Sequence, residues 1–195
     1  MTTKQIFASC AKTVFALAAV VMMSNVFTAC SKDNNDGDDN GNLITATTTE
    51  GVGKTIEVMV AENDKPQTEG LEEVNRHIED GWLKIDYQVK EQTFKIKGAI
   101  TKLAVDYCNL KALHVARAAT LREIYCHNNM LNSSTLSLPA VSNGLLYFKG
   151  ASEDAQTLTP QKVKELRNKG WKVLMEDDEG YAWVAYEGED PSAEE

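Results

Sequence analysis

The residue types that most often carry chemistry are few in this chain, and their spacing does not assemble a reactive site. Cys126 and His127 are neighbours and could act as nucleophile and base, but adjacent strand residues point to opposite faces and could not share a proton. The histidines His77, His114 and His127 show no spacing with cysteine or carboxylate that would hold a metal ion. We therefore expect neither a cofactor nor catalysis, and predict that the chain is not an enzyme.

Two segments have the composition of ligand-binding loops without the full pattern. Residues 51–55 lack the first glycine of a phosphate-binding loop, because Thr48 stands there, and a strand pattern follows them. Residues 33–39 are rich in aspartate, but the twelfth position of a calcium loop, which needs glutamate, is Ile44. We interpret the first segment as a turn and the second as a tether, for which weak calcium association stays open.

Residues 100–131 carry an internal repeat with a step of 21 residues. Both units follow the leucine-rich-repeat template, whose units bury their apolar edges only against their neighbours. This predicts an α/β, β-rich solenoid: a short leucine-rich-repeat coil that offers a binding surface rather than an active site. The aligned pairs are Ile100 with Leu121, Leu103 with Ile124, Val105 with Cys126, Cys108 with Asn129, and Leu110 with Leu131.

The remaining patterns predict the elements on either side of the repeat. Alternation in residues 43–49 and 55–60 indicates a hairpin, and residues 82–89 and 93–98 read as strands. Leu71, Val74 and Ile78 share one helical face, which predicts a short helix over residues 68–80. After a third, degenerate rung at residues 145–149, Thr159 and Pro160 open a helix that Gly170 ends, and residues 171–175 and 181–186 give closing strands.

The N-terminus has the pattern of an export signal. Lys4 and Lys12 precede an apolar run over residues 13–26, which is shorter than the roughly 20 residues of a comfortable bilayer span. Residues 27–30, Phe-Thr-Ala-Cys, resemble a bacterial lipobox, which implies a diacylglyceryl group on Cys30 and, with Ser31 next, export to the outer membrane. Two or more acyl chains give stable anchoring. The alternative is an ordinary signal peptide with a coincidental cysteine.

The predicted organisation has six segments. They are a lipoprotein signal peptide (1–29), an acidic flexible tether (30–42), an N-terminal β-rich cap (43–97), leucine-rich-repeat rungs (98–150), a C-terminal helix-strand cap (151–187) and an acidic tail (188–195).

Charge and cysteine content restrict the partners and the bonding. Residues 1–29 hold two of the 20 Lys and Arg residues and none of the 29 Asp and Glu residues, so the remainder carries 18 minus 29, or −11. Such a chain repels phosphate backbones, and nucleic acid is not an expected partner. Cys108 and Cys126 remain, and an oxidising compartment would permit a disulfide. Their repeat positions favour buried thiols instead, but their bonding stays open.

Residues 94–131 look like the leucine-rich-repeat surface lipoproteins of anaerobic Gram-negative bacteria, which are internalin-like in the broad sense. The second unit keeps that family's Cys126 and Asn129, whereas the first has Val105 and Cys108. Residues 158–173 resemble the family's closing helix and strand, although Gly170 stands where asparagine is usual. The resemblance implies a surface-exposed interaction or adhesion protein without enzymatic activity.

The outward residues of the rungs form the candidate binding face. Matching positions on neighbouring strands lie about 4.8 Å apart, which places Tyr125 beside Tyr147. It also places His127 between Asp106 and Lys149. These contacts either anchor a partner, since exposed aromatics among charges are typical of interfaces, or simply solvate and stabilise the sheet. The candidates are Lys102, Asp106, Glu123, Tyr125, His127, Tyr147 and Lys149.

Together these features predict a membrane-anchored, surface-exposed lipoprotein that acts as a protein-binding or adhesion module. Its partner would be a host or bacterial surface protein, and it would contact the outer membrane through Cys30. The alternative is a structural or accessory subunit of an outer-membrane or periplasmic envelope complex, which could handle glycans. In that case the chain would face the periplasm.

Overall fold

The computed structural model describes residues 41–150, 155–177, 179–180 and 182–189. The predicted signal peptide, the lipidation site at Cys30 and nearly all of the tether lie outside these residues, as does most of the acidic tail. The described residues contain thirteen strands and one helix, α1 (Pro160–Asn168).

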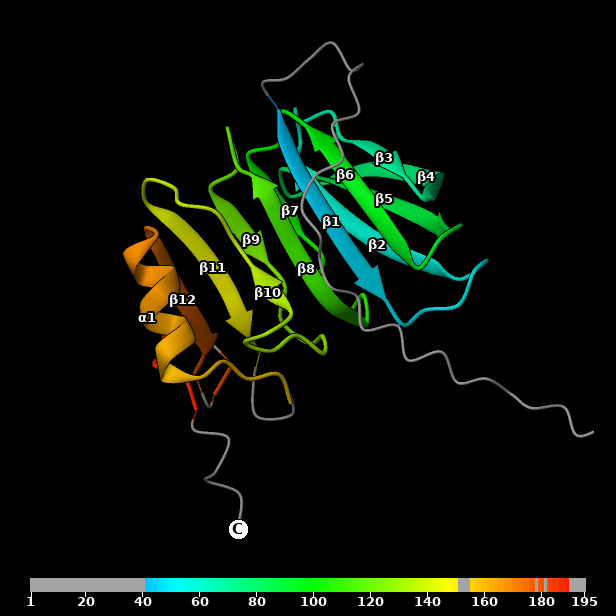
Figure 1. Ribbon diagram of the computed structural model, residues 1–195. Coiled ribbons are helices and arrows are strands. Elements are labelled where there is room, and N and C mark those ends of the chain that lie inside the picture. Colours follow the sequence, from blue (N-terminus) through cyan, green and yellow to red (C-terminus); the bar gives the residue numbers. More distant parts are fainter. Residues whose placement is uncertain (1–40, 151–154, 178, 181, 190–195) are drawn as a thin grey trace, which may run out of the picture. The chain divides into compact units, whose positions relative to one another are not determined.

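The strands form two sheets, and the chain passes from one to the other repeatedly. Figure 1 shows β1, β6 and β8 in one layer, with β2, β5 and β7 in the layer behind them. The five-stranded sheet has the order β10 (Leu136–Ser137), β8 (Leu110–Arg117), β1 (Asn42–Thr48), β6 (Thr93–Gly98) and β3 (Gln67–Glu69). The eight-stranded sheet has the order β13 (Trp183–Ala185), β12 (Trp171–Glu176), β11 (Gly144–Lys149), β9 (Glu123–Tyr125), β7 (Lys102–Ala104), β2 (Thr55–Ala61), β5 (Trp82–Val89) and β4 (Leu71–Glu79).

A single hydrophobic core joins the two sheets. Every second residue of β1 and of β5 is buried, as expected for strands with one face on a core. Ile44 and Phe94 of the five-stranded sheet belong to the same buried cluster as Ile85, Leu103 and Leu146 of the eight-stranded sheet. Because each such side chain contributes about 1.5–3 kcal/mol on full burial, this shared core holds the sheets together.

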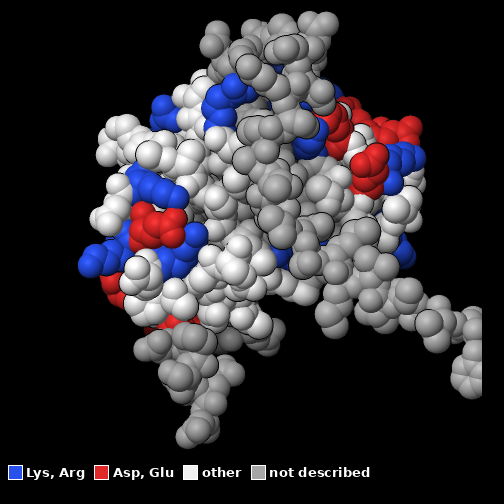
Figure 2. Space-filling view, viewed as in Figure 1, with Lys and Arg blue, Asp and Glu red and all other residues white. Residues whose placement is uncertain are grey.

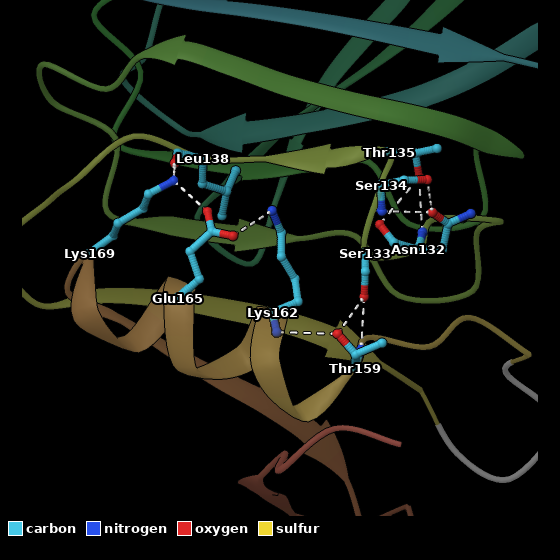
Figure 3. Close-up of polar contacts among 9 residues, drawn as sticks. All are labelled: Asn132, Ser133, Ser134, Thr135, Leu138, Thr159, Lys162, Glu165 and Lys169. Atoms are coloured by element: carbon cyan, nitrogen blue, oxygen red, sulfur yellow. Dashed lines mark hydrogen bonds and ion pairs between the residues drawn. The ribbon is translucent and has the colours of Figure 1, made fainter. Parts of the chain in front are cut away.

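Helix α1 begins and ends where the sequence predicts. Thr159 accepts a hydrogen bond from the Lys162 backbone N–H at 3.3 Å (Figure 3). Pro160 occupies the first turn. Gly170 has a φ of 89°, and a Cβ there would lie 2.0 Å from the Val141 carbonyl oxygen, so only glycine fits after the helix.

Polar contacts attach α1 to residues on both sides of β10. The Thr159 N–H donates to the Ser133 hydroxyl at 2.8 Å, and the Lys169 ammonium donates to the Leu138 carbonyl at 3.1 Å (Figure 3). On its buried side, Val163 and Leu166 join the core, and the helix lies beside β12 (Figure 1). The helix therefore covers the end of the eight-stranded sheet that lies farthest from β4.

The prediction of an α/β leucine-rich-repeat solenoid is wrong. The described chain is 51% strand and 6% helix in two mixed sheets, which is a β-sandwich-like fold. The two repeat units do supply the parallel neighbours β7 and β9, but the other edge of β7 pairs with β2 in the antiparallel sense. The segment expected to cap a coil, residues 43–97, instead provides six strands to the two sheets. The two repeat units leave one edge of β7 open, and the antiparallel strand β2 pairs with that edge.

Two local predictions are also wrong. The hairpin expected from residues 43–49 and 55–60 does not form, because β1 and β2 lie in different sheets. The expected helix over residues 68–80 is β3 followed by β4. A β-bulge between Glu73 and Asn75 adds one residue to β4, so Leu71 and Ile78 lie on the same side of the strand and imitate a helical spacing. By contrast, the predicted strands over residues 82–89, 93–98 and 145–149 are confirmed.

Asn129 links the two repeat units from within the core. Its Nδ2 donates to the Val105 and Cys126 carbonyls, both at 2.9 Å, and its Oδ1 accepts from the Leu110 N–H at 2.8 Å. These backbone groups are buried and belong to both turns of the chain. The amide therefore satisfies polar groups that would otherwise lower stability.

We predict that Asn129→Ala lowers the free energy of unfolding by about 3 kcal/mol, because it leaves several buried backbone groups without partners. Urea denaturation measures the change. Gln92→Ala is the control, since Gln92 is exposed and makes one 3.3 Å bond to the Glu50 carbonyl, and it should cost less than about 0.5 kcal/mol. Equal losses in the two variants would contradict the role given to Asn129.

Candidate functional site

The outer face of the eight-stranded sheet is built by parallel strands in register. β7, β9 and β11 align Ala104 with Tyr125 and Tyr125 with Tyr147, and β12 continues the row with Leu174. Residues aligned in this way have side chains on the same side of the sheet. The core-facing neighbours, such as Leu103 and Ile124, point the other way and are fully buried.

Two tyrosines form the centre of this face. The rings of Tyr125 and Tyr147 are stacked, with centroids 4.0 Å apart and planes 4° apart. The Tyr125 hydroxyl also donates to the Glu123 carboxylate at 3.3 Å. Partial burial, together with the hydroxyl of Tyr147, raises the pKa of Tyr125 far above its ordinary value, so the phenol stays protonated. The degenerate third rung at residues 145–149, placed beside the second repeat unit, predicts this neighbour pair.

Two tryptophans flank the tyrosines and were not identified from the sequence. Trp82, on β5, lies 5.4 Å from the Tyr125 ring at an interplanar angle of 84°. Trp183, on β13, lies 4.9 Å from the Tyr147 ring at 82°. Trp82 reaches Tyr125 across β2 and β7, where Ala104 is only 2% exposed although it faces outward. The alternation in residues 82–89 places Trp82 outward, but only the strand order shows which rings it meets.

The row of rings continues through a histidine to an exposed tyrosine. The centroid of the His127 ring lies 5.4 Å from that of Trp183 and 5.7 Å from that of Tyr107. Tyr107 has a φ of 55° and is 72% exposed. We call the continuous set of six rings the aromatic strip. Its members are Trp82, Tyr125, Tyr147, Trp183, His127 and Tyr107.

Charged residues border the aromatic strip on one side. Lys102 pairs with Glu123 at 3.1 Å, as the register predicts, and its ammonium lies 5.8 Å from the centre of the Trp82 ring. Lys149 differs from expectation. It pairs with Glu189 and lies 6.0 Å from the Tyr186 ring, because a register shift between Tyr147 and Lys149 displaces the end of β11. The other six predicted residues gather on the outer face.

Asp106 and His127 carry buried polar atoms at this face. Asp106 Oδ1 and His127 Nδ1 are buried and have no hydrogen-bond partner. Burial raises the pKa of Asp106, and the nearby His127 opposes part of that shift. The sheet therefore holds a carboxylate at this position against its desolvation cost.

The cysteines do not form a reactive site with this histidine. Cys108 and Cys126 are free and buried, and Cys108 Sγ donates to the Glu57 carbonyl at 3.2 Å. Burial raises the pKa of the Cys108 thiol well above its ordinary value, which keeps it protonated. Cys126 lies in the core while His127 faces outward, as strand alternation predicts.

The part of the chain that the structure describes contains no group of three histidine, cysteine or carboxylate side chains placed to hold a metal ion. None of its helices is long and apolar enough to cross a membrane. Comparison of the chain with protein-family models, with curated proteins and with solved structures finds no match.

We predict that Asp106→Asn raises the free energy of unfolding near neutral pH. The folded-state pKa of Asp106 lies above its ordinary value of 3.8, so the ionised carboxylate destabilises the fold above that range. The gain should shrink as the pH falls through the raised pKa and vanish below the ordinary one. Urea denaturation at about pH 7, 5 and 3 tests this.

The matched control is Glu62→Gln, because Glu62 is exposed. A gain for Asp106→Asn that stays constant down to about pH 3, or one that Glu62→Gln reproduces, would exclude burial of the Asp106 charge as the cause.

Proposed function

We propose that this chain is a non-catalytic binding module that recognises a protein partner through the aromatic strip. The observation that carries the proposal is the continuity of the six rings, each within 6 Å of the next, across the outer face of the eight-stranded sheet. Tyrosine and tryptophan are enriched in the cores of protein interfaces and among the residues that dominate binding energy.

The contacts among the rings hold the side chains in place before binding, which favours affinity and specificity. Tyr125 and Tyr147 stack on each other, and Trp82 and Trp183 meet them edge to face. These contacts fix the side chains before a partner arrives, so little rotamer entropy is lost on binding. The tyrosine faces turned toward each other are occupied, which leaves the ring edges for the partner. Such amphipathic contacts suit a protein surface that is both apolar and polar.

The charges around the strip supply orientation rather than affinity. Lys102 and Glu123 form a partly exposed ion pair at one border, and surface pairs are worth about 0.2–1 kcal/mol. Polar groups at the rim of an interface mainly select the partner and its orientation. The proposed module therefore combines an aromatic centre with a charged rim.

Photo-crosslinking in the cells that make the protein tests the recognition surface. We predict that p-benzoylphenylalanine in place of Tyr107 gives a discrete adduct of higher mass. The same group in place of Lys111, exposed on β8 of the other sheet, should give none. Adding Tyr125→Ala and Tyr147→Ala should weaken binding about thirtyfold or more and remove the adduct. Adducts of equal yield at both positions, or an adduct that survives the double substitution, would contradict the proposal.

The lipobox-like segment that ends at Cys30 supports a lipid anchor for this module at the cell surface. We predict that protease added to intact cells digests residues 41–189, and that Cys30→Ala moves the protein from the membrane to the soluble fraction. A Cys108→Ala variant should stay in the membrane, which controls for loss of a cysteine as such. Protection from protease until the outer membrane is opened would indicate the periplasmic face and favour an envelope-complex subunit.

A further inference from the structure

Strand β4 forms one edge of the eight-stranded sheet and follows β5 in the strand order. It is nine residues long, and all of its residues after Leu71 are exposed. Acidic and basic side chains gather at this edge (Figure 2). A long exposed edge strand offers backbone groups to any strand that can pair with it.

The pairing of β5 shows which backbone N–H and C=O groups of β4 point away from the sheet. Val89 donates to the Lys54 carbonyl and accepts from the Gly53 N–H, both at 2.8 Å, so its hydrogen bonds run toward β2. Because bonded and non-bonded pairs alternate along an antiparallel strand, every second residue of β5 from Val89 to Leu83 also bonds toward β2. The residues of β4 opposite these positions, whose N–H and C=O groups therefore point outward, are Leu71, Glu73, Arg76 and Ile78.

We propose that β4 pairs with β4 of a second copy of this chain, antiparallel, about a two-fold axis between Val74 and Asn75. In this register every outward-pointing residue of one copy meets an outward-pointing residue of the other. Glu73 faces Arg76 of the second copy, and Leu71 faces Ile78. The two reciprocal Glu73–Arg76 pairs exchange their backbone bonds at the centre of the interface. At each end the Leu71 carbonyl also has the Thr68 hydroxyl, 3.5 Å away.

Charge complementarity selects this register. Glu73 meets Arg76 of the second copy, so opposite charges face each other in both central pairs, and Glu72 lies opposite His77. Within one chain Glu73 and Arg76 already form an ion pair across the bulge, and pairing would convert it into a four-residue network. A shift of two residues toward the C-terminus would bring Glu72 against Glu79, and like charges directly opposite each other are destabilising.

Apolar side chains at the same edge favour pairing. Val74 is 63% exposed and Ile78 is 58% exposed, and both belong to the few large hydrophobic side chains that the described residues leave in solvent. In the proposed dimer Ile78 of each copy lies opposite Leu71 of the other, and the two Val74 side chains lie next to the axis. Pairing therefore removes apolar surface from water as well as satisfying backbone groups.

The bulge and the charges could instead protect the edge from pairing, because both features are used in that way. The bulge does not break the proposed register, since it lies at the axis and both copies carry it at the same place. The protective explanation predicts a monomer at every concentration, so the two readings differ in a measurable quantity.

The test is the protein mass of the full chain in detergent micelles, measured by light scattering coupled to size exclusion. Because two paired edge strands bury less than the roughly 1,600 Å² of a standard interface, the dimer should form in the micromolar range, over about 1–100 μM. A monomer throughout that range would overturn the proposal. The wild-type result also fixes the dissociation constant against which variants are compared.

Charge reversal tests the register itself. Glu73→Lys alone and Arg76→Glu alone each place like charges opposite each other and should weaken self-association about a hundredfold. An equal mixture of the two variants restores opposite charges at both central pairs and should form a heterodimer. Lys111→Glu, on β8, should dimerise like the wild type. Variants that still self-associate, or a mixture that stays monomeric while both variants keep the wild-type thermal unfolding midpoint, would overturn the proposed register.

Discussion

The in-register parallel pairing of β7, β9 and β11 is the constraint on which the rest of the molecule depends. It places Leu103, Ile124 and Leu146 in one row on the core side, and the two stacked tyrosines in a row on the outer side. A slip of one residue in any of these strands would exchange the two faces and put apolar side chains in water. The buried amide of Asn129 opposes such a slip, because its bonds join backbone groups of both repeat units.

The functional surface arises where this parallel centre meets antiparallel flanks. The centre supplies the tyrosine pair, and its two neighbouring regions supply the tryptophans, Trp82 from β5 and Trp183 from β13. Neither tryptophan is a part of the repeat, so the strip spans most of the width of the sheet. A surface of this kind needs the whole sandwich beneath it, since the core holds the strands that carry the rings. Stability and recognition are therefore linked through the same sheet.

Much of the candidate site could be predicted from the sequence, whereas the fold class could not. The step of 21 residues predicts that Lys102 lies beside Glu123, because a repeat sets a register. The degenerate third rung at residues 145–149 predicts that Tyr147 lies beside Tyr125. The repeat does not show that β2 takes the open edge of β7, which is a long-range antiparallel pairing with no local signal. The helix predicted over residues 68–80 is wrong because the bulge in β4 changes the spacing of its apolar residues to that of a helical face. Spacing alone does not distinguish a bulged strand from a helix. The register shift that brings Lys149 to Glu189 has no signal in the repeat either.

The central claim is that the outer face of the eight-stranded sheet, and not the opposite face of the sandwich, is covered by a partner. Hydrogen–deuterium exchange of the chain in the membranes of the cells that make it, compared with the purified chain in detergent, tests this most directly. The account predicts added protection in β7, β9 and β11 and at Tyr107, with little change in β1, β6 and β8. Protection confined to the five-stranded sheet, or no difference between the two samples, would contradict it.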